Sequence, residues 1–205
     1  MKLIILASAS PRRKILLEQI NLKFETHPQN ISETIDKTIT PEDFAVLTAK
    51  KKATKAVSQF PNALIIGCDT IVVHQNEVLG KPADKAEAYR MLTKLSGNSH
   101  IVITAIVLIK SGPDGSIISS KEFFELTDVT FSPLEKDEIH EYIQTGSPFD
   151  KAGAYGIQDD WGSVFVSGIK GDYYNVVGFP LNRFYQTLKK YAPEYLPSAT
   201  SNNLQ

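Results

Sequence analysis

The chain has 205 residues, which suffices for one globular domain with a substantial core or for two small lobes. It contains 42% hydrophobic and 22% charged residues, and its net charge of −1 gives no overall basic field that would favour nucleic acid as a partner. A single cysteine excludes an internal disulfide, and no apolar stretch approaches the roughly 20 residues that cross a bilayer, so we expect a cytoplasmic protein without a membrane partner.

Patterns typical of strands and helices alternate along the chain, and this alternation predicts an α/β fold. The expected elements are strands at 3–6, 22–26, 63–73, 78–79, 100–110, 117–131 and 163–169, and helices that begin at Ser10, Thr40, Asp84, Ser132 and Pro180. No linker marks a boundary. We therefore expect one domain over residues 1–192, followed by a flexible tail at 193–205.

The segment Ser8-Ala9-Ser10-Pro11-Arg12-Arg13 joins the first strand to the first helix. Ser10 is a good N-cap, and Pro11 suits the first helical position. Arg12 and Arg13 nevertheless place two cations at the positive end of the helix dipole, where acidic side chains are favoured. Hydroxyls, backbone N–H groups and guanidinium groups in one place indicate an anion site. The alternative is a solvated turn whose arginines point away.

A carboxylate, Asp69, interrupts the long apolar strand pattern at 63–73. Burying an unpaired carboxylate is very costly, so we expect Asp69 to be paired, protonated, metal-bound or at the edge of a cleft. A structural ion pair is the alternative to a functional role. Gly80-Lys81-Pro82 holds a lysine in a tight loop that suits a phosphate contact, although the segment is not a P-loop. Lys52 is one of several lysines on its helix, and helix geometry alone does not select it.

The loop Asp150-Lys151-Ala152-Gly153-Ala154-Tyr155-Gly156-Ile157-Gln158 combines small and polar residues. Such a loop could read the edge of a base or sugar, or it could be a long irregular connection. The four histidines have no zinc-binding spacing, and no Gly-x-Ser-x-Gly segment is present. The remaining carboxylates, lysines and arginines are typical of metal-assisted phosphoryl chemistry.

Taken together, six motifs resemble the Maf family of nucleoside triphosphate pyrophosphatases, in the family's order and spacing over about residues 3–191. They are Leu6-Ala7-Ser8-Ala9-Ser10-Pro11-Arg12-Arg13, Gly67-Cys68-Asp69-Thr70, Gly80-Lys81-Pro82, Leu95-Ser96-Gly97 with His100 and Thr104, the loop at 150–158, and Asn175-Val176-Val177-Gly178-Phe179-Pro180-Leu181. The resemblance implies a mixed twisted sheet with flanking helices, two lobes around a deep cleft, and a homodimer. It also implies metal-dependent cleavage of a nucleoside triphosphate to the monophosphate and pyrophosphate.

The resemblance further implies roles for residues on the phosphate side of the site. Asp69 matches the family's proton acceptor, and together with Glu33, which matches an acidic site residue, it would hold Mg²⁺ or Mn²⁺. Ser10, Arg12 and Arg13 match the phosphate-binding loop.

Other matched positions concern the triphosphate and the choice of substrate. Lys52 and Lys81 match basic residues that face the triphosphate. Arg12, Thr70 and Gln158 match positions linked to substrate choice. The form of the loop that ends at Gln158 resembles the branch of the family that acts on dTTP and UTP rather than the branch that prefers 7-methyl-GTP. Pseudouridine triphosphate and 5-methyl-UTP are expected as further substrates.

Two other functions remain open from the sequence. One is a nucleotide-sensing or division-regulating module that binds triphosphates without hydrolysing them. The other is a housecleaning enzyme for damaged purine triphosphates such as ITP. An enzyme for pyrimidine triphosphates would serve to clean the nucleotide pool or to restrain cell division.

Overall fold

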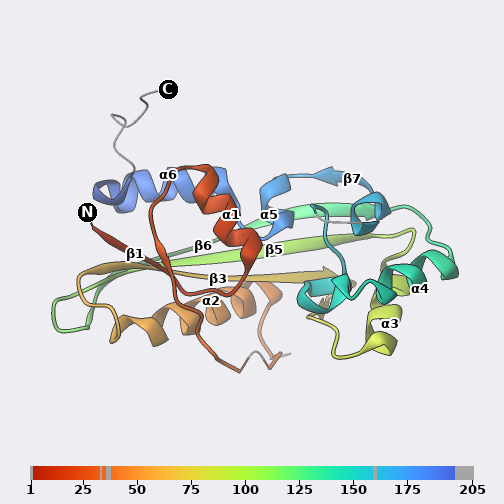
Figure 1. The fold of residues 1–205 in the computed structure, drawn as a ribbon, viewed down its shortest axis with the longest axis horizontal. Helices are drawn as coiled ribbons and strands as arrows, with labels where there is room; N and C mark the ends of the chain where they lie inside the picture. Colours follow the sequence, from red (N-terminus) through yellow and green to blue (C-terminus); the bar gives the residue numbers. More distant parts are fainter. Residues whose placement is uncertain (1, 33, 36–37, 159–160, 197–205) are drawn as a thin grey trace.

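The computed structural model describes residues 2–32, 34–35, 38–158 and 161–196, and within these ranges seven strands form one mixed sheet (Figure 1). The strands are β1 (Leu3–Leu6), β2 (Glu25–Thr26), β3 (Ala63–His74), β4 (Glu77–Leu79), β5 (Ser99–Ser111), β6 (Ile117–Phe131) and β7 (Val166–Lys170). Their order is β2-β1-β3-β5-β6-β7, and β4 pairs with β3 beside this path. β1 is parallel to β2 and β3, whereas the other pairs are antiparallel. The predicted α/β class with a mixed sheet is confirmed.

Helices cover both faces of the sheet. They are α1 (Pro11–Gln19), α2 (Pro41–Val57), α3 (Lys85–Leu95), α4 (Lys136–Gln144), α5 (Tyr173–Val177) and α6 (Leu181–Tyr191). α2 packs on one face, whereas α1 and α6 lie on the other, and α3 and α4 gather at the far end (Figure 1). The molecule therefore has two ends, one with α1, α2 and α6 and the other with α3 and α4, and the middle of β3 lies between them.

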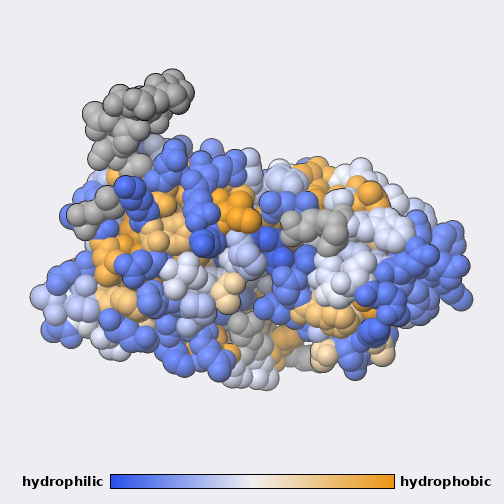
Figure 2. All heavy atoms as spheres, viewed as in Figure 1, coloured by the Kyte–Doolittle hydropathy of each residue, from blue (hydrophilic) through white to orange (hydrophobic). Residues whose placement is uncertain are grey.

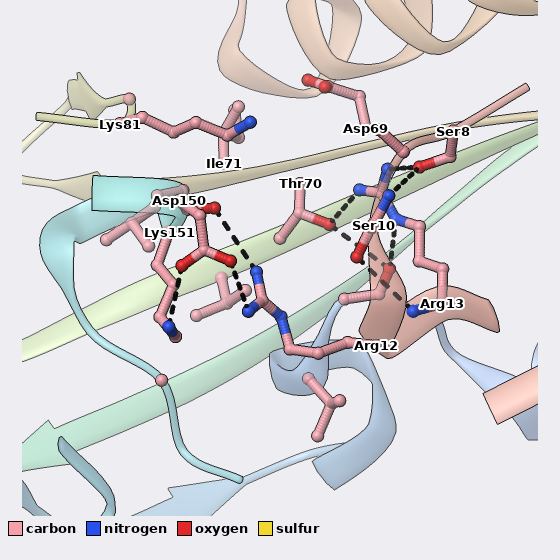
Figure 3. A pocket seen from close by; sticks show the side chains of 18 of the residues that line it. Ser8, Ser10, Arg12, Arg13, Asp69, Thr70, Ile71, Lys81, Asp150 and Lys151 are labelled. Atoms are coloured by element: carbon pink, nitrogen blue, oxygen red, sulfur yellow. Dashed lines mark hydrogen bonds and ion pairs between the residues drawn. The ribbon is translucent and has the colours of Figure 1, made fainter. Parts of the chain in front are cut away.

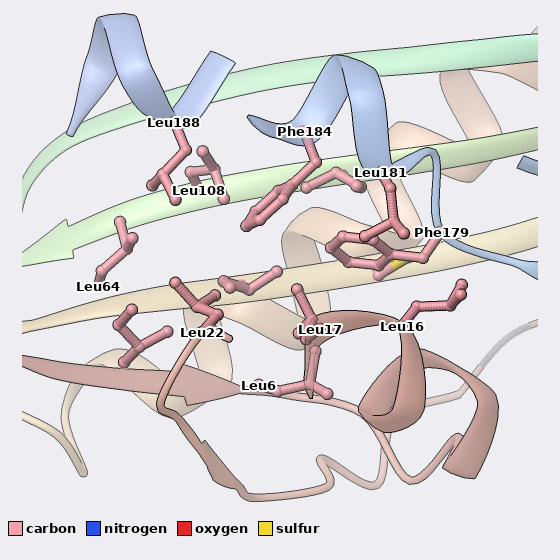
Figure 4. Close-up of a cluster of buried hydrophobic side chains, with 14 of the residues drawn as sticks. Leu6, Leu16, Leu17, Leu22, Leu64, Leu108, Phe179, Leu181, Phe184 and Leu188 are labelled. Atoms are coloured by element: carbon pink, nitrogen blue, oxygen red, sulfur yellow. The ribbon is translucent and has the colours of Figure 1, made fainter. Parts of the chain in front are cut away.

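The face under α1 and α6 is packed with leucine and phenylalanine side chains (Figure 4). Leu16 and Leu17 of α1 share this cluster with Leu64 of β3, and Phe184 and Leu188 of α6 lie on its opposite side. Burial of a Leu or Phe side chain stabilises the fold by about 1.5–3 kcal/mol. This packing fixes α1, and with it the two arginines of its first turn.

Three predicted helix starts are confirmed by their caps. The side chains of Ser10, Thr40 and Asp84 each accept a hydrogen bond from the backbone N–H three residues later. The start predicted at Ser132 is wrong, because α4 begins at Lys136 with a capping box between Glu135 and Glu138.

Contacts from distant segments explain the later start of α4. The N–H of Ser132 donates to the carbonyl of Phe165, and the N–H of Leu134 donates to Ser96 Oγ. These bonds hold the segment before Glu135 outside the helix.

The tail expected from residue 193 is packed in its first part. Residues Pro193–Tyr195 form a short 3₁₀ helix, and Tyr195 and Leu196 pack against the cluster under α6. The rest of the expected tail, residues 197–205, lies outside the described residues. Among the described helices, none has the length and apolar character that crossing a membrane requires.

One edge of β3 changes its strand partner in the middle of the molecule. β1 pairs with residues 63–66, and β4 pairs with residues 72–74. Between them, the described chain places no strand beside residues 67–71 on that edge. Ligands in α/β proteins commonly bind where a sheet changes its connections in this way.

Candidate active site

A cavity of about 580 Å³ lies against this stretch of β3. Its walls include the turn between β1 and α1 with the first turn of α1, part of α2, the middle of β3, the loop after β4, the loop after α4, and α5. In the space-filling view the surface is hollowed between the two ends of the molecule, with hydrophilic residues around the hollow (Figure 2). Its volume is in the range of small-molecule sites.

The structure brings nearly all the predicted site residues to this cavity. Eight of them line it: Ser10, Arg12, Arg13, Lys52, Asp69, Thr70, Lys81 and Gln158. The ninth, Glu33, lies outside the described residues. The predicted site is therefore one place in the fold, although the role of each residue stays a prediction.

Arg13 is buried and donates hydrogen bonds to four neutral acceptors (Figure 3). Its Nε donates to the carbonyl of Gly178 at 3.0 Å, and its Nη1 donates to Ser8 Oγ and the carbonyl of Cys68, both at 3.0 Å. Its Nη2 donates to Thr70 Oγ1 at 2.9 Å. These acceptors offset the unfavourable position of the cation at the start of α1. Burial raises the pKa of the Cys68 thiol to about 11, so this thiol stays protonated near neutral pH.

Arg12 reaches across the cavity to the loop after α4 (Figure 3). Its Nη1 lies 2.9 Å from Asp150 Oδ2, and its Nη2 donates to the carbonyl of Asp150 at 3.4 Å. Partial burial alone would raise the pKa of Asp150, but the hydrogen bond from Lys151 and the charge of Arg12 hold it below its usual value. The solvated-turn alternative is wrong, because both arginines line the cavity wall.

Asp69 and Lys52 form a buried ion pair at the wall of the cavity. Lys52 Nζ donates to Asp69 Oδ1 at 2.7 Å, and the side chains of Lys52 and Asp69 are only 10% and 8% exposed. Lys52 comes from α2, on the face of the sheet opposite to Thr70 and Arg13. The structural and the functional interpretation of Asp69 are therefore compatible, since Asp69 has an ion-pair partner and also borders the cavity.

Comparison with known proteins identifies the family. Residues 3–191 match the sequence profile of the family described as Maf-like protein. The chain belongs to the Maf-like family. It is 46% identical over 190 residues to a protein of Geobacillus sp. (strain WCH70) named dTTP/UTP pyrophosphatase, covering 93% of this chain and 98% of that protein. A protein of the same name from Halalkalibacterium halodurans is 48% identical over 189 residues, covering 92% and 96%.

A solved structure supports the fold independently of sequence. The HAM1 protein from Coxiella burnetii superposes on this Maf-like chain with a TM-score of 0.52, covering 93% of this chain and all of that one. Only 15% of the aligned residues are identical, so the match concerns the arrangement of strands and helices alone.

In this Maf-like protein a hydrogen-bond network extends from Thr70 into the core. Thr70 Oγ1 lies 3.0 Å from Thr104 Oγ1, which donates to the carbonyl of Asn175 at 3.0 Å. The Asn175 amide donates to the carbonyl of Val102 and to Thr127 Oγ1. Asn175 is the first residue of the last of the six motifs, and the structure places it in the short helix α5. Thr127 was missed, because its position in a strand pattern carries no signal of this contact.

Tyr155 lines the cavity, and its hydroxyl contacts the buried side chain of His100. The Tyr155 hydroxyl lies 2.7 Å from His100 Nε2, and both rings pack edge to face on Phe131. Burial, with a smaller contribution from the neighbouring His74, lowers the pKa of His100 from 6.5 to about 4.

The low pKa of His100 predicts a pH-dependent stability. Above pH 6.5 this histidine is neutral in both folded and unfolded chains, whereas between pH 6.5 and 4 only the unfolded chain binds a proton there. Lowering the pH across that interval should therefore reduce the free energy of unfolding by about 3 kcal/mol through His100. Urea unfolding at several pH values should show a smaller pH dependence in His100→Asn than in the wild type. As a control, His140→Asn, at an exposed position, should show the same pH dependence of the free energy of unfolding as the wild type.

The donor groups of the cavity fit a cation that is shared with a phosphate. Among the described residues, no three His, Cys, Asp or Glu side chains cluster in metal-binding geometry. The described lining includes two carboxylates, Asp69 and Asp150, and the second is bound by two cations. Mg²⁺ typically binds one or two carboxylates and completes its shell with substrate phosphate oxygens and water. Asp69 supplies one such carboxylate, and its Oδ1 also accepts a hydrogen bond from Lys52.

Proposed function

We propose that this Maf-like protein is a nucleoside triphosphate pyrophosphatase that hydrolyses dTTP and UTP to the monophosphate and pyrophosphate. The observation that carries the proposal is the cavity, in which Asp69 borders a space that also contacts Arg12, Lys52 and Lys81. Asp150 is held by Arg12 and Lys151, and a further carboxylate, Asp69, among several cations suits a polyanionic substrate attacked by water. The names of the relatives at 46% and 48% identity favour dTTP and UTP as the substrates.

In the proposed reaction, Asp69 accepts a proton from water as the water oxygen bonds to the α-phosphorus. The bond from that phosphorus to the bridging oxygen of the β-phosphate breaks, and pyrophosphate leaves. Arg12 and Lys81 stabilise the charge on the leaving group, while Lys52 holds the Asp69 carboxylate in place. A divalent cation, Mg²⁺ or Mn²⁺, held by Asp69 and by Glu33 as the sequence predicts, would neutralise charge on the triphosphate.

The start of α1 would bind a phosphate group. Ser10 lines the cavity, and the first backbone N–H groups of a helix favour anions. Arg13 would contribute its positive charge from the wall, although four of its N–H groups already bind protein acceptors.

Selection of the base would occur on the other side of the cavity. The amide of Gln158 can both donate and accept a hydrogen bond, which matches the N3–H and O4 groups on the edge of uracil or thymine. Pseudouridine triphosphate and 5-methyl-UTP present an equivalent edge and would also be accepted. The proposed cellular role is removal of such triphosphates from the nucleotide pool, with a homodimer as the working form.

A panel of nucleoside triphosphates tests the proposed function. The protein is incubated with dTTP, UTP, CTP, GTP, ATP and ITP in Mg²⁺ or Mn²⁺, and released pyrophosphate and monophosphate are measured. We expect kcat/KM for dTTP and UTP to exceed that for the other four by at least about tenfold. A preference for ITP would instead support an enzyme for damaged purines. Release from none of them, with retained binding, would support a nucleotide sensor.

A further inference from the structure

One carboxylate joins the two sides of the cavity. Asp150 ends the 3₁₀ helix Ser147–Asp150 and accepts hydrogen bonds from Arg12 at one oxygen and from Lys151 at the other, at 2.9 and 2.8 Å (Figure 3). Arg12 and Asp150 are 138 residues apart in the chain. The contact therefore links the start of α1 to the loop after α4.

Lys151 transmits this contact into the loop that follows. Its side chain is 8% exposed, and Nζ also donates to the carbonyl and the hydroxyl of Ser147 at 2.8 and 2.9 Å. Its methylene stem lies under Gly156, where an added Cβ would come within 2.7 Å of Lys151 Cε. The lysine thus supports the backbone two residues before Gln158.

The same loop is fixed to the segment that carries Lys81. The N–H of Gly153 donates to the carbonyl of Gly80 at 3.0 Å, next to that lysine. Gly153 has a φ of +67°, and an added Cβ would come within 2.9 Å of Val72, so its backbone lies directly on β3. The loop at 151–158 is therefore anchored on one side, and Asp150 controls its distance from Arg12 on the other.

We propose that Asp150 is a positioning residue that sets the separation between the phosphate-binding and base-reading sides of the cavity. The inference rests on the proposed function. Arg12 keeps its place through both the side chain and the backbone carbonyl of Asp150, while Lys151 keeps the base-reading loop in place through the same carboxylate. A nucleotide has a fixed distance between its phosphates and its base, so loss of this link should weaken binding and discrimination together.

If Asp150 had a purely structural role, its removal would mainly lower the stability of the fold. The Asp150 side chain is 55% exposed, and ion pairs with such a partner contribute little to global stability. Its removal should therefore change substrate binding far more than it changes unfolding. The pair Arg183–Glu125, at 3.1 Å and outside the cavity lining, provides a matched control.

The test compares Asp150→Asn, Asp150→Glu and Glu125→Gln with the wild type on UTP, dTTP, CTP and GTP. In Asp150→Asn we expect KM for UTP and dTTP to rise about tenfold, kcat to change by less than about threefold, and the preference for UTP over GTP in kcat/KM to fall about tenfold. Asp150→Glu, which keeps the charge, should recover part of the preference. Glu125→Gln should match the wild type in all these values, and all variants should unfold within a few degrees of it.

Two outcomes would overturn the inference. One is an Asp150→Asn protein with wild-type KM and preference. The other is a parallel loss of kcat on every substrate together with a lower unfolding temperature. If the wild type hydrolyses none of the four triphosphates, the proposed function has failed, and the same proteins are compared by calorimetric binding of UTP. Asp150→Asn should then bind about tenfold more weakly, and an unchanged Kd would overturn the positioning role.

Discussion

Asp69→Asn is expected to lower kcat for dTTP and UTP by about a thousandfold, the size typical of losing a general base. Asparagine keeps the shape of aspartate and an oxygen that can accept the hydrogen bond from Lys52, but it cannot take a proton from water. The substitution therefore removes the chemistry while disturbing the wall of the cavity as little as possible. Initial rates of pyrophosphate release at saturating UTP measure the effect.

The buried pair requires that stability be measured alongside turnover. Removing one partner of a buried ion pair destabilises a protein by about 3–5 kcal/mol, and Asn should lie at the low end because it retains an acceptor. Circular dichroism and thermal unfolding of Asp69→Asn establish the folded fraction at the assay temperature. Asp128→Asn, an exposed aspartate of β6 outside the cavity lining, should keep wild-type kcat. Near-normal turnover by folded Asp69→Asn would show that Asp69 is not the general base.

The helix starts and the strands of this fold follow largely from local sequence. An N-cap such as Thr40 or Asp84 acts on the backbone three residues away, so its signal is complete within a short window. The long strands β3, β5 and β6 are similarly marked by continuous β-type residues. The start of α4 could not be read in this way, because Ser132 and Leu134 are held by Phe165 and Ser96 from other parts of the chain.

The pairing of charges in the site depends on the fold and not on local pattern. The sequence marked Asp69 as anomalous and Arg12 as misplaced, yet their partners Lys52 and Asp150 lie 17 and 138 residues away. Neighbouring lysines on α2 look alike in sequence. Lys52 is selected only because α2 crosses β3 with that position facing Asp69.

Gly67→Ala is expected to be the most damaging conservative change in the core, because α2 lies directly on this residue. A Cβ at Gly67 would come within 2.1 Å of the carbonyl oxygen of Ala49 and 2.8 Å of the Cβ of Ala53. Both contacts involve backbone or a side chain that cannot rotate away, so α2 must move off the sheet. Overpacking of this kind costs about 1–3 kcal/mol and sometimes more, and we expect about 3 kcal/mol or more here.

The displacement should also reach the site, since the same helix carries Lys52 to Asp69. We therefore expect Gly67→Ala to lose both stability, measured by urea unfolding, and turnover in the fraction that remains folded. Gly168→Ala, in β7, introduces a methyl group with no heavy atom within 4 Å and should leave both unchanged. Equal stability of the two variants would mean that α2 can shift away from β3 without lowering the free energy of unfolding. The close contact at Gly67 would then not constrain the position of α2 on the sheet.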